Sequence, residues 1–176
     1  MDKETFHFRR YMESDGDILY EAYTQYCRAR IQPYFSGVGV GAERQRFLEE
    51  IQKLSRRKHC RPIIADSQNR PIGIYRTTFR RANGYHELMI HLWEGQELAV
   101  PILRRIVDEA LHRERPEDSF LLEAAGCDPY LTEAAQTLGL KCCGMIPNYL
   151  CCDEGLCHRY FYVVTSGQWY SRQKPA

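Results

Sequence analysis

The chain has 176 residues, 44% hydrophobic and 27% charged, a balance typical of one globular domain with a sizeable core. Its 24 basic side chains nearly cancel 23 acidic ones, and the net charge of +1 argues against a nucleic-acid partner, because phosphate binding requires a basic surface. With no apolar run near the roughly 18 residues that span a bilayer and a charged N-terminus unlike a signal peptide, we expect a cytoplasmic protein without a membrane partner.

The first half of the chain predicts a strand, two helices and a β-hairpin. Residues 5–10 form a short strand, and Ser14 and Asp15 offer oxygens to cap the amphipathic helix that follows. A second helix is expected at 42–57, where apolar residues recur at helical spacing. Strands at 62–65 and 72–75 then flank a polar turn.

The second half predicts a strand at 87–92 and a helix from about Leu98 to Leu111, with Pro101 tolerated in its first turn. A strand at 120–124 precedes a short helix that Asp128-Pro129 starts and Gly139 closes. Two long strands fill 141–165 and join at 153–155. No repeat or linker interrupts this order, so we expect a single domain over residues 1–176.

Four stretches of the sequence carry a family resemblance. They are FHFRRYMESDGDILYEAY, RPIIADSQNRPIGIYRTTF, HELMIHLWEG and LTEAAQTLGLKCCGMIPNYLCCDEGLCHRYFYVV. In this order they resemble the GNAT superfamily of N-acetyltransferases, especially the branch that acetylates ribosomal-protein N-termini, polyamines and related amines. The resemblance covers nearly the whole chain. It implies an α+β fold in α/β/α layers, with a mixed, mostly antiparallel sheet of about seven strands and about four helices.

The resemblance also implies acetyl-CoA as co-substrate. The backbone around Ile90, His91 and Leu92 would pair with the pantetheine arm, and the pyrophosphate would lie on N–H groups at the start of the third helix. There the family pattern Q/R-x-x-G-x-G/A is matched by Gln96, Glu97, Leu98, Ala99, Val100 and Pro101. Asp128 stands where members often have an asparagine that touches the cofactor.

This cofactor loop departs from the family pattern mildly at Ala99 and more seriously at Pro101. Pro101 removes one N–H donor, and Glu97 places a negative charge close to where phosphates would lie. These departures favour a second interpretation, in which the domain is not catalytic and binds another ligand or a protein partner.

The catalytic candidates are Glu87, which the resemblance implies as the base, and Tyr149 as the acid. Glu87 matches a fourth-strand glutamate of this branch, and its alternative role is a strand-edge glutamate that is exposed or paired with an arginine. The acid is harder to place, because Ala135 occupies the position where many members have a tyrosine. Tyr130 is expected to pack rather than react, and Tyr149 in the closing hairpin is a candidate donor.

Five of the eight cysteines fall in the closing hairpin, where the turn could bring Cys151 or Cys152 near Cys157. Adjacent cysteines on one strand point to opposite faces and make poor shared ligands, so no metal site is assigned and small buried thiols are expected. A metal- or redox-sensing role for these cysteines is the most distant alternative.

The sequence therefore predicts an N-acetyltransferase that moves an acetyl group from acetyl-CoA to a primary amine, by direct attack in a ternary complex. The acceptor is expected to be a small-molecule amine or a protein N-terminus. Edge strands of this fold often pair, so the resemblance also admits a homodimer.

Overall fold

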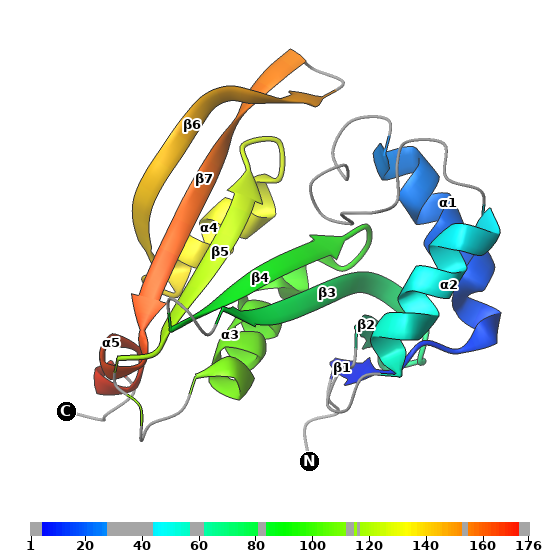
Figure 1. Cartoon of the computed structure of the whole chain (residues 1–176), viewed down its shortest axis with the longest axis horizontal. Coiled ribbons are helices and arrows are strands. Elements are labelled where there is room, and N and C mark those ends of the chain that lie inside the picture. The colour runs from blue at the N-terminus through cyan, green and yellow to red at the C-terminus, as the bar shows by residue number, and fades with distance from the viewer. Residues whose placement is uncertain are drawn as a thin grey trace. The chain divides into compact units, whose positions relative to one another are not determined.

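A computed structural model describes residues 5–27, 44–56, 62–80, 84–111, 115, 117–152 and 155–172. These residues contain a seven-stranded sheet with the strand order β1-β2-β3-β4-β5-β7-β6 (Figure 1). The chain divides into two compact units. The first contains Met1–Arg76, Ile90–Gly95 and Cys151–Glu154, and the second contains Thr77–Met89, Gln96–Leu150 and Gly155–Ala176. A single domain over 1–176 stays a prediction.

The first unit combines antiparallel strands with two helices. β1 (Phe6–Arg9) pairs with β2 (Ile63–Asp66), and β2 pairs with the start of β3 (Pro71–Arg80). α1 (Gly16–Cys27) contacts α2 (Arg44–Ser55), beside which it lies in Figure 1. These elements confirm the predicted order, although β3 is longer than the predicted 72–75. Thr77 and Thr78 extend it, since β-branched residues favour the extended backbone.

The start of α1 differs from the expectation that Asp15 caps the helix. Asp15 belongs to a 3-10 turn, η1 (Glu13–Asp15), and is 2% exposed. Its carboxylate accepts the Met12 backbone N–H at 2.8 Å and the Arg9 guanidinium at 2.7 and 2.8 Å. The hydrogen bonds of this carboxylate therefore link the end of β1 to the turn before the helix, instead of capping the helix itself.

Gly73 on β3 sits where a side chain would collide with β4 (Tyr85–Leu92). A Cβ atom at this position would lie 2.5 Å from Leu92 Cδ2 and 2.7 Å from the His91 carbonyl oxygen. The carbonyl cannot move away without shifting the strand that carries it. The close approach of the two strands therefore requires glycine.

We expect Gly73→Ala to lower the free energy of unfolding by about 1–3 kcal/mol, because the methyl group overpacks the strand contact. Urea unfolding followed by circular dichroism measures the change. Gly144→Ala is the matched control, since a Cβ there meets only Phe161 Cδ2, at 3.8 Å. Equal losses in the two variants would contradict the proposed collision.

The second unit is built around β5 (Ser119–Ala125), a strand with the apolar sequence expected of a core position. β5 pairs parallel with β4 and antiparallel with β7 (Gly155–Thr165), with Ser119 opposite Thr165 and Ala125 opposite Arg159. β6 (Lys141–Cys152) forms the edge of the sheet beyond β7. The parallel pair makes the sheet mixed, as predicted.

The helices of the second unit, α3 (Ala99–Ala110) and α4 (Pro129–Thr137), are both predicted from the sequence. They contact each other, and α4 also contacts β5. The buried stripe of α3 contains Ile102, Leu103, Ile106 and Val107. Gly139 after α4 has φ 72°, the left-handed conformation expected at that helix end. None of the helices in the described part of the chain is long and apolar enough to cross a bilayer.

A fifth helix, α5 (Ser166–Ser171), was not predicted. Its first turn is a capping box in which Thr165 accepts the Gln168 N–H and the Gln168 side chain accepts the Thr165 N–H. Trp169 Nε1 donates to Asp108 Oδ1 at 2.7 Å, and Tyr170 Oη donates to the Leu111 carbonyl at 2.8 Å. The sequence signal was present as Thr-x-x-Gln directly after a strand.

Candidate functional site

The parallel pairing of β4 with β5 stops before either strand ends. It covers four positions, from Tyr85 opposite Ser119 to Leu88 opposite Leu122. β4 nevertheless continues to Leu92 and β5 to Ala125. Beyond Leu88 the ladder no longer joins these two fully described strands.

Glu87, the predicted base, lies on β4 just before this point. Its side chain is 13% exposed and its Oε2 accepts from Arg80 Nε at 2.9 Å and Nη2 at 2.7 Å. The hydrogen bond to Glu87 and its negative charge raise the pKa of Arg80. The structure thus contains the arginine pair that the sequence analysis gave as the alternative role. Catalysis by Glu87 stays a prediction.

A second carboxylate, that of Glu123 on β5, was not predicted from the sequence. Glu87 is opposite Leu121, so Glu123, two residues further along β5, is on the same face of the sheet. Glu123 is 6% exposed and forms an ion pair with Arg159 on β7. This face therefore carries two carboxylates, and each is held by an arginine. The only sequence signal was a glutamate inside the apolar run of β5.

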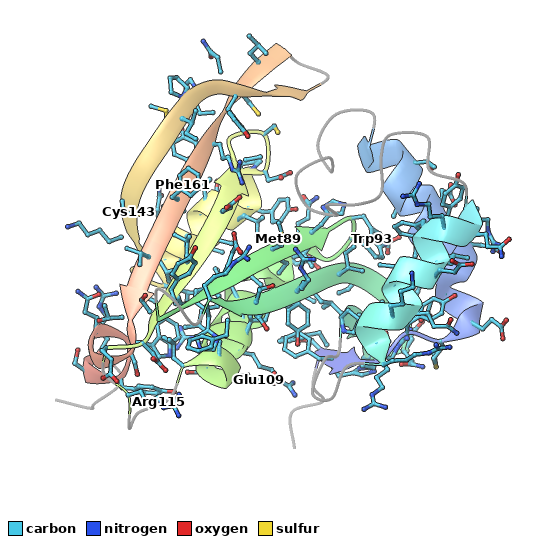
Figure 2. All side chains as sticks on the ribbon, viewed as in Figure 1. Met89, Trp93, Glu109, Arg115, Cys143 and Phe161 are labelled. Carbon is cyan, nitrogen blue, oxygen red and sulfur yellow. The ribbon has the colours of Figure 1, made fainter. Side chains whose placement is uncertain are left out.

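Tyr149, the predicted acid, lies on β6 and is 49% exposed. The guanidinium carbon of Arg159 is 5.0 Å from the centroid of its ring and 5.3 Å from that of Phe161, which Figure 2 labels on β7. The cation thus contacts two aromatic rings. Tyr149 is connected through Arg159 to Glu123, and its role as an acid stays a prediction.

The predicted phosphate-binding residues form the start of α3. Gln96, Glu97 and Leu98 make a 3-10 turn, η2, and Ala99 and Val100 are the first two residues of the helix. The opening N–H groups of a helix have no partner inside it and can bind an anion. Pro101, third in the helix, lacks this donor. Glu97 is exposed, so its charge stands beside the remaining donors.

The other predicted cofactor residues are buried. Ile90, His91 and Leu92, in the first unit, are 2%, 6% and 0% exposed, so a ligand at β4 would meet backbone rather than these side chains. The His91 ring centroid is 5.8 Å from that of Trp93. Asp128, in the second unit, is 1% exposed and precedes α4, where its carbonyl accepts the Leu131 N–H at 3.0 Å. Their roles in cofactor binding stay predictions.

The cysteines are arranged differently from the expectation of small buried thiols. Cys142 and Cys143 on β6 are exposed, so the expectation is wrong for this pair. Cys157 contacts Cys127, which lies outside the hairpin, at an Sγ–Sγ distance of 3.2 Å. The side chains of Cys151 and Cys152 lie outside the described part of the structure. Within the described residues, no three His, Cys, Asp or Glu side chains gather as they would around a metal ion.

No family model matches this chain, and no curated protein matches it by sequence. Solved structures match its fold along nearly its whole length. The spermidine/spermine N-acetyltransferase SpeG of Vibrio cholerae, solved as mutant forms, has a TM-score of 0.71 at 12% identity, covering 97% of this chain and 99% of that one.

Two further structures of the Vibrio cholerae enzyme agree. Spermidine N-acetyltransferase in complex with CoA and spermine has a TM-score of 0.69 at 13% identity, with 94% and 98% coverage. A dodecameric structure in an intermediate state has the same TM-score at 14% identity, with 97% and 99% coverage. At this level of identity the likeness establishes the fold, and the chain therefore has the GNAT N-acetyltransferase fold that its sequence resembles.

Proposed function

We propose that this protein is an N-acetyltransferase that moves an acetyl group from acetyl-CoA to a primary amine in a ternary complex. The observation that carries the proposal is the fold, which solved N-acetyltransferase structures match over nearly the full chain. One of those similar structures holds CoA and spermine.

The residues at the start of α3 fit a pyrophosphate in part. Ala99 and Val100 supply backbone N–H groups at the positive end of the helix dipole, whereas Pro101 supplies none. Bound acetyl-CoA would supply the thioester whose acyl group is transferred. Holding the acceptor amine beside that thioester would provide much of the rate acceleration.

Glu87 is the group proposed to remove a proton from the attacking amine, directly or through one water molecule. Arg80 bonds to Oε2, so Oε1 is the oxygen that we assign to this task. The exposed hydroxyl of Tyr149 is the proposed donor to the departing sulfur.

The acceptor is proposed to be a cationic amine, either a small molecule such as a polyamine or a protein N-terminus. Its support is the likeness to the solved N-acetyltransferase that holds CoA together with spermine, a cationic amine. Spermidine, spermine and a peptide with a free N-terminus are the first acceptors to compare. A homodimer stays a proposal that light scattering can test.

A second function is supported by Pro101, Glu97 and Ala135. The first two weaken the anion site, and Ala135 is fully buried and has no hydroxyl to protonate a leaving group. These residues favour a GNAT-like domain that binds another ligand or a protein partner without acetyl transfer.

Calorimetric titration with acetyl-CoA separates the two functions. We expect micromolar binding by the natural chain, and about fivefold tighter binding by Glu97→Gln, since removing a unit charge near a phosphate relieves about 1 kcal/mol of repulsion in water. High salt should erase that gain. Glu109→Gln, near the opposite end of α3, is the matched control and should leave the Kd unchanged. Absence of heat for both the natural chain and Glu97→Gln would favour the non-catalytic function.

A further inference from the structure

Two half-buried thiols meet in the second unit. Cys127 follows β5, Cys157 belongs to β7, and their sulfur atoms lie 3.2 Å apart. Neither thiol has a part in the proposed acetyl transfer. The closeness of two thiols from different elements raises the question of what chemistry they share.

The backbone geometry around the pair suits a covalent bond between the sulfurs. The antiparallel register of β5 and β7 reaches Ala125 opposite Arg159, and Gly126 N–H then donates to the His158 carbonyl at 2.8 Å. Cys127 then lies in a turn that the Asp128 N–H closes on the Ala125 carbonyl at 2.9 Å, just past the last paired residues, where its sulfur contacts that of Cys157. Sulfur atoms that already lie 3.2 Å apart must approach by only about 1 Å to form an S–S bond of about 2.05 Å.

The neighbouring thiols lack this arrangement. Cys143 Sγ contacts the Phe161 carbonyl at 3.4 Å, and Cys142 Sγ contacts the Gly144 carbonyl at 3.6 Å. As successive residues of β6, these two side chains point to opposite faces of the sheet. Figure 2 labels Cys143 on that strand. They are more exposed than Cys127 and Cys157, so exposure alone would make them the first thiols to react.

We propose that Cys127 and Cys157 are a redox modification site at which a hydroperoxide forms a reversible disulfide. One thiolate attacks a peroxide oxygen, which gives a sulfenic acid and releases water after protonation. The second thiolate then attacks that sulfur, the S–S bond forms and a second water leaves. Two thiols and one hydrogen peroxide become one disulfide and two water molecules, so the sulfurs are oxidised and the peroxide is reduced.

The test treats the whole reduced chain with one equivalent of hydrogen peroxide, blocks remaining thiols with an alkylating reagent and analyses the protein by mass spectrometry. We expect the main product to carry two alkyl groups fewer than the fully reduced control and, apart from those groups, to weigh about 2 Da less because disulfide formation removes two hydrogens. Digestion should yield a peptide linked through Cys127 and Cys157, which dithiothreitol separates. A product linked through Cys142, Cys143, Cys151 or Cys152 instead, or oxidation without any linked product, would overturn the proposal.

Two variants sharpen the assignment without any need for acetyl-CoA. Cys157→Ser should abolish the mass loss, whereas the matched control Cys143→Ser should retain it. If Cys157→Ser still loses two hydrogens at the same rate, another pair is responsible and the proposal fails. The peptide map of the natural chain decides the question even if a variant does not fold. Because peroxide and mass are the only readouts, the result is independent of whether the protein acetylates amines.

Discussion

Glu87→Gln is expected to reduce kcat for amine acetylation by about 10²–10⁴-fold, the usual contribution of a positioned general base. The amide is close in shape to the carboxylate but cannot accept the proton of the ammonium group. The change is measured from CoA release with a thiol reagent, with spermidine as the first acceptor. The KM for acetyl-CoA should change little, since Glu87 is not among the predicted cofactor residues.

Arg80→Ala distinguishes the catalytic role of Glu87 from the structural one. It breaks the same ion pair, whose Nη2–Oε2 distance is 2.7 Å, but leaves the carboxylate in place. If Glu87 is the base, kcat should fall far more in Glu87→Gln than in Arg80→Ala. If the two variants lose similar stability and both keep their kcat, Glu87 is a strand residue paired with arginine.

Asp15→Ala is expected to lower the free energy of unfolding by about 3–5 kcal/mol, because removing one partner of a buried ion pair leaves the other charge uncompensated. The Arg9 side chain is 12% exposed and that of Asp15 is 3% exposed. The substitution also deprives the Met12 N–H of its acceptor. Urea unfolding at neutral pH measures the loss, which is large beside a typical total stability of about 5–15 kcal/mol.

Asp17, two residues further along, provides the matched control. It pairs with Arg44 at 2.6 Å, but these side chains are 90% and 51% exposed. Asp17→Ala should therefore cost no more than about 1 kcal/mol. A double-mutant cycle with Arg9→Ala isolates the coupling between Arg9 and Asp15. Similar losses of unfolding free energy in Asp15→Ala and Asp17→Ala would show that burial does not determine how much the Arg9–Asp15 ion pair contributes to stability.

Most of the fold was predictable because its elements are encoded locally. Apolar spacing indicated α3, Gly139 marked the end of α4, and an acidic turn with Gly155 separated β6 from β7. Two parts of the fold, the end of β3 and the helix α5, were not predicted, and for different reasons. The end of β3 is too polar for an apolar pattern to reveal, and α5 is too short to have a periodic stripe. Only the capping box at Thr165 could have indicated α5.

The candidate site was less predictable, because its interactions join residues far apart in sequence. Glu87 was identified by its position on a strand, but nothing in the sequence selects Arg80 among the many arginines as its partner. The same holds for Glu123 and Arg159, and for Cys127 and Cys157. Local patterns indicate which strand carries a side chain, whereas the register between strands decides what it meets.

The position of β7 has a consequence for synthesis of the chain. β5 pairs with β7 although β6 comes first in sequence. This edge of β5 is therefore covered only after the chain has been synthesised as far as Thr165, the partner of Ser119. At about 5–20 residues per second, the edge stays open on the ribosome for several seconds. It belongs to an apolar strand whose one charge is Glu123, and open apolar edges recruit other strands. Aggregation is therefore most favoured in the nascent chain, and slower initiation, which spaces ribosomes along the message, should raise the soluble yield.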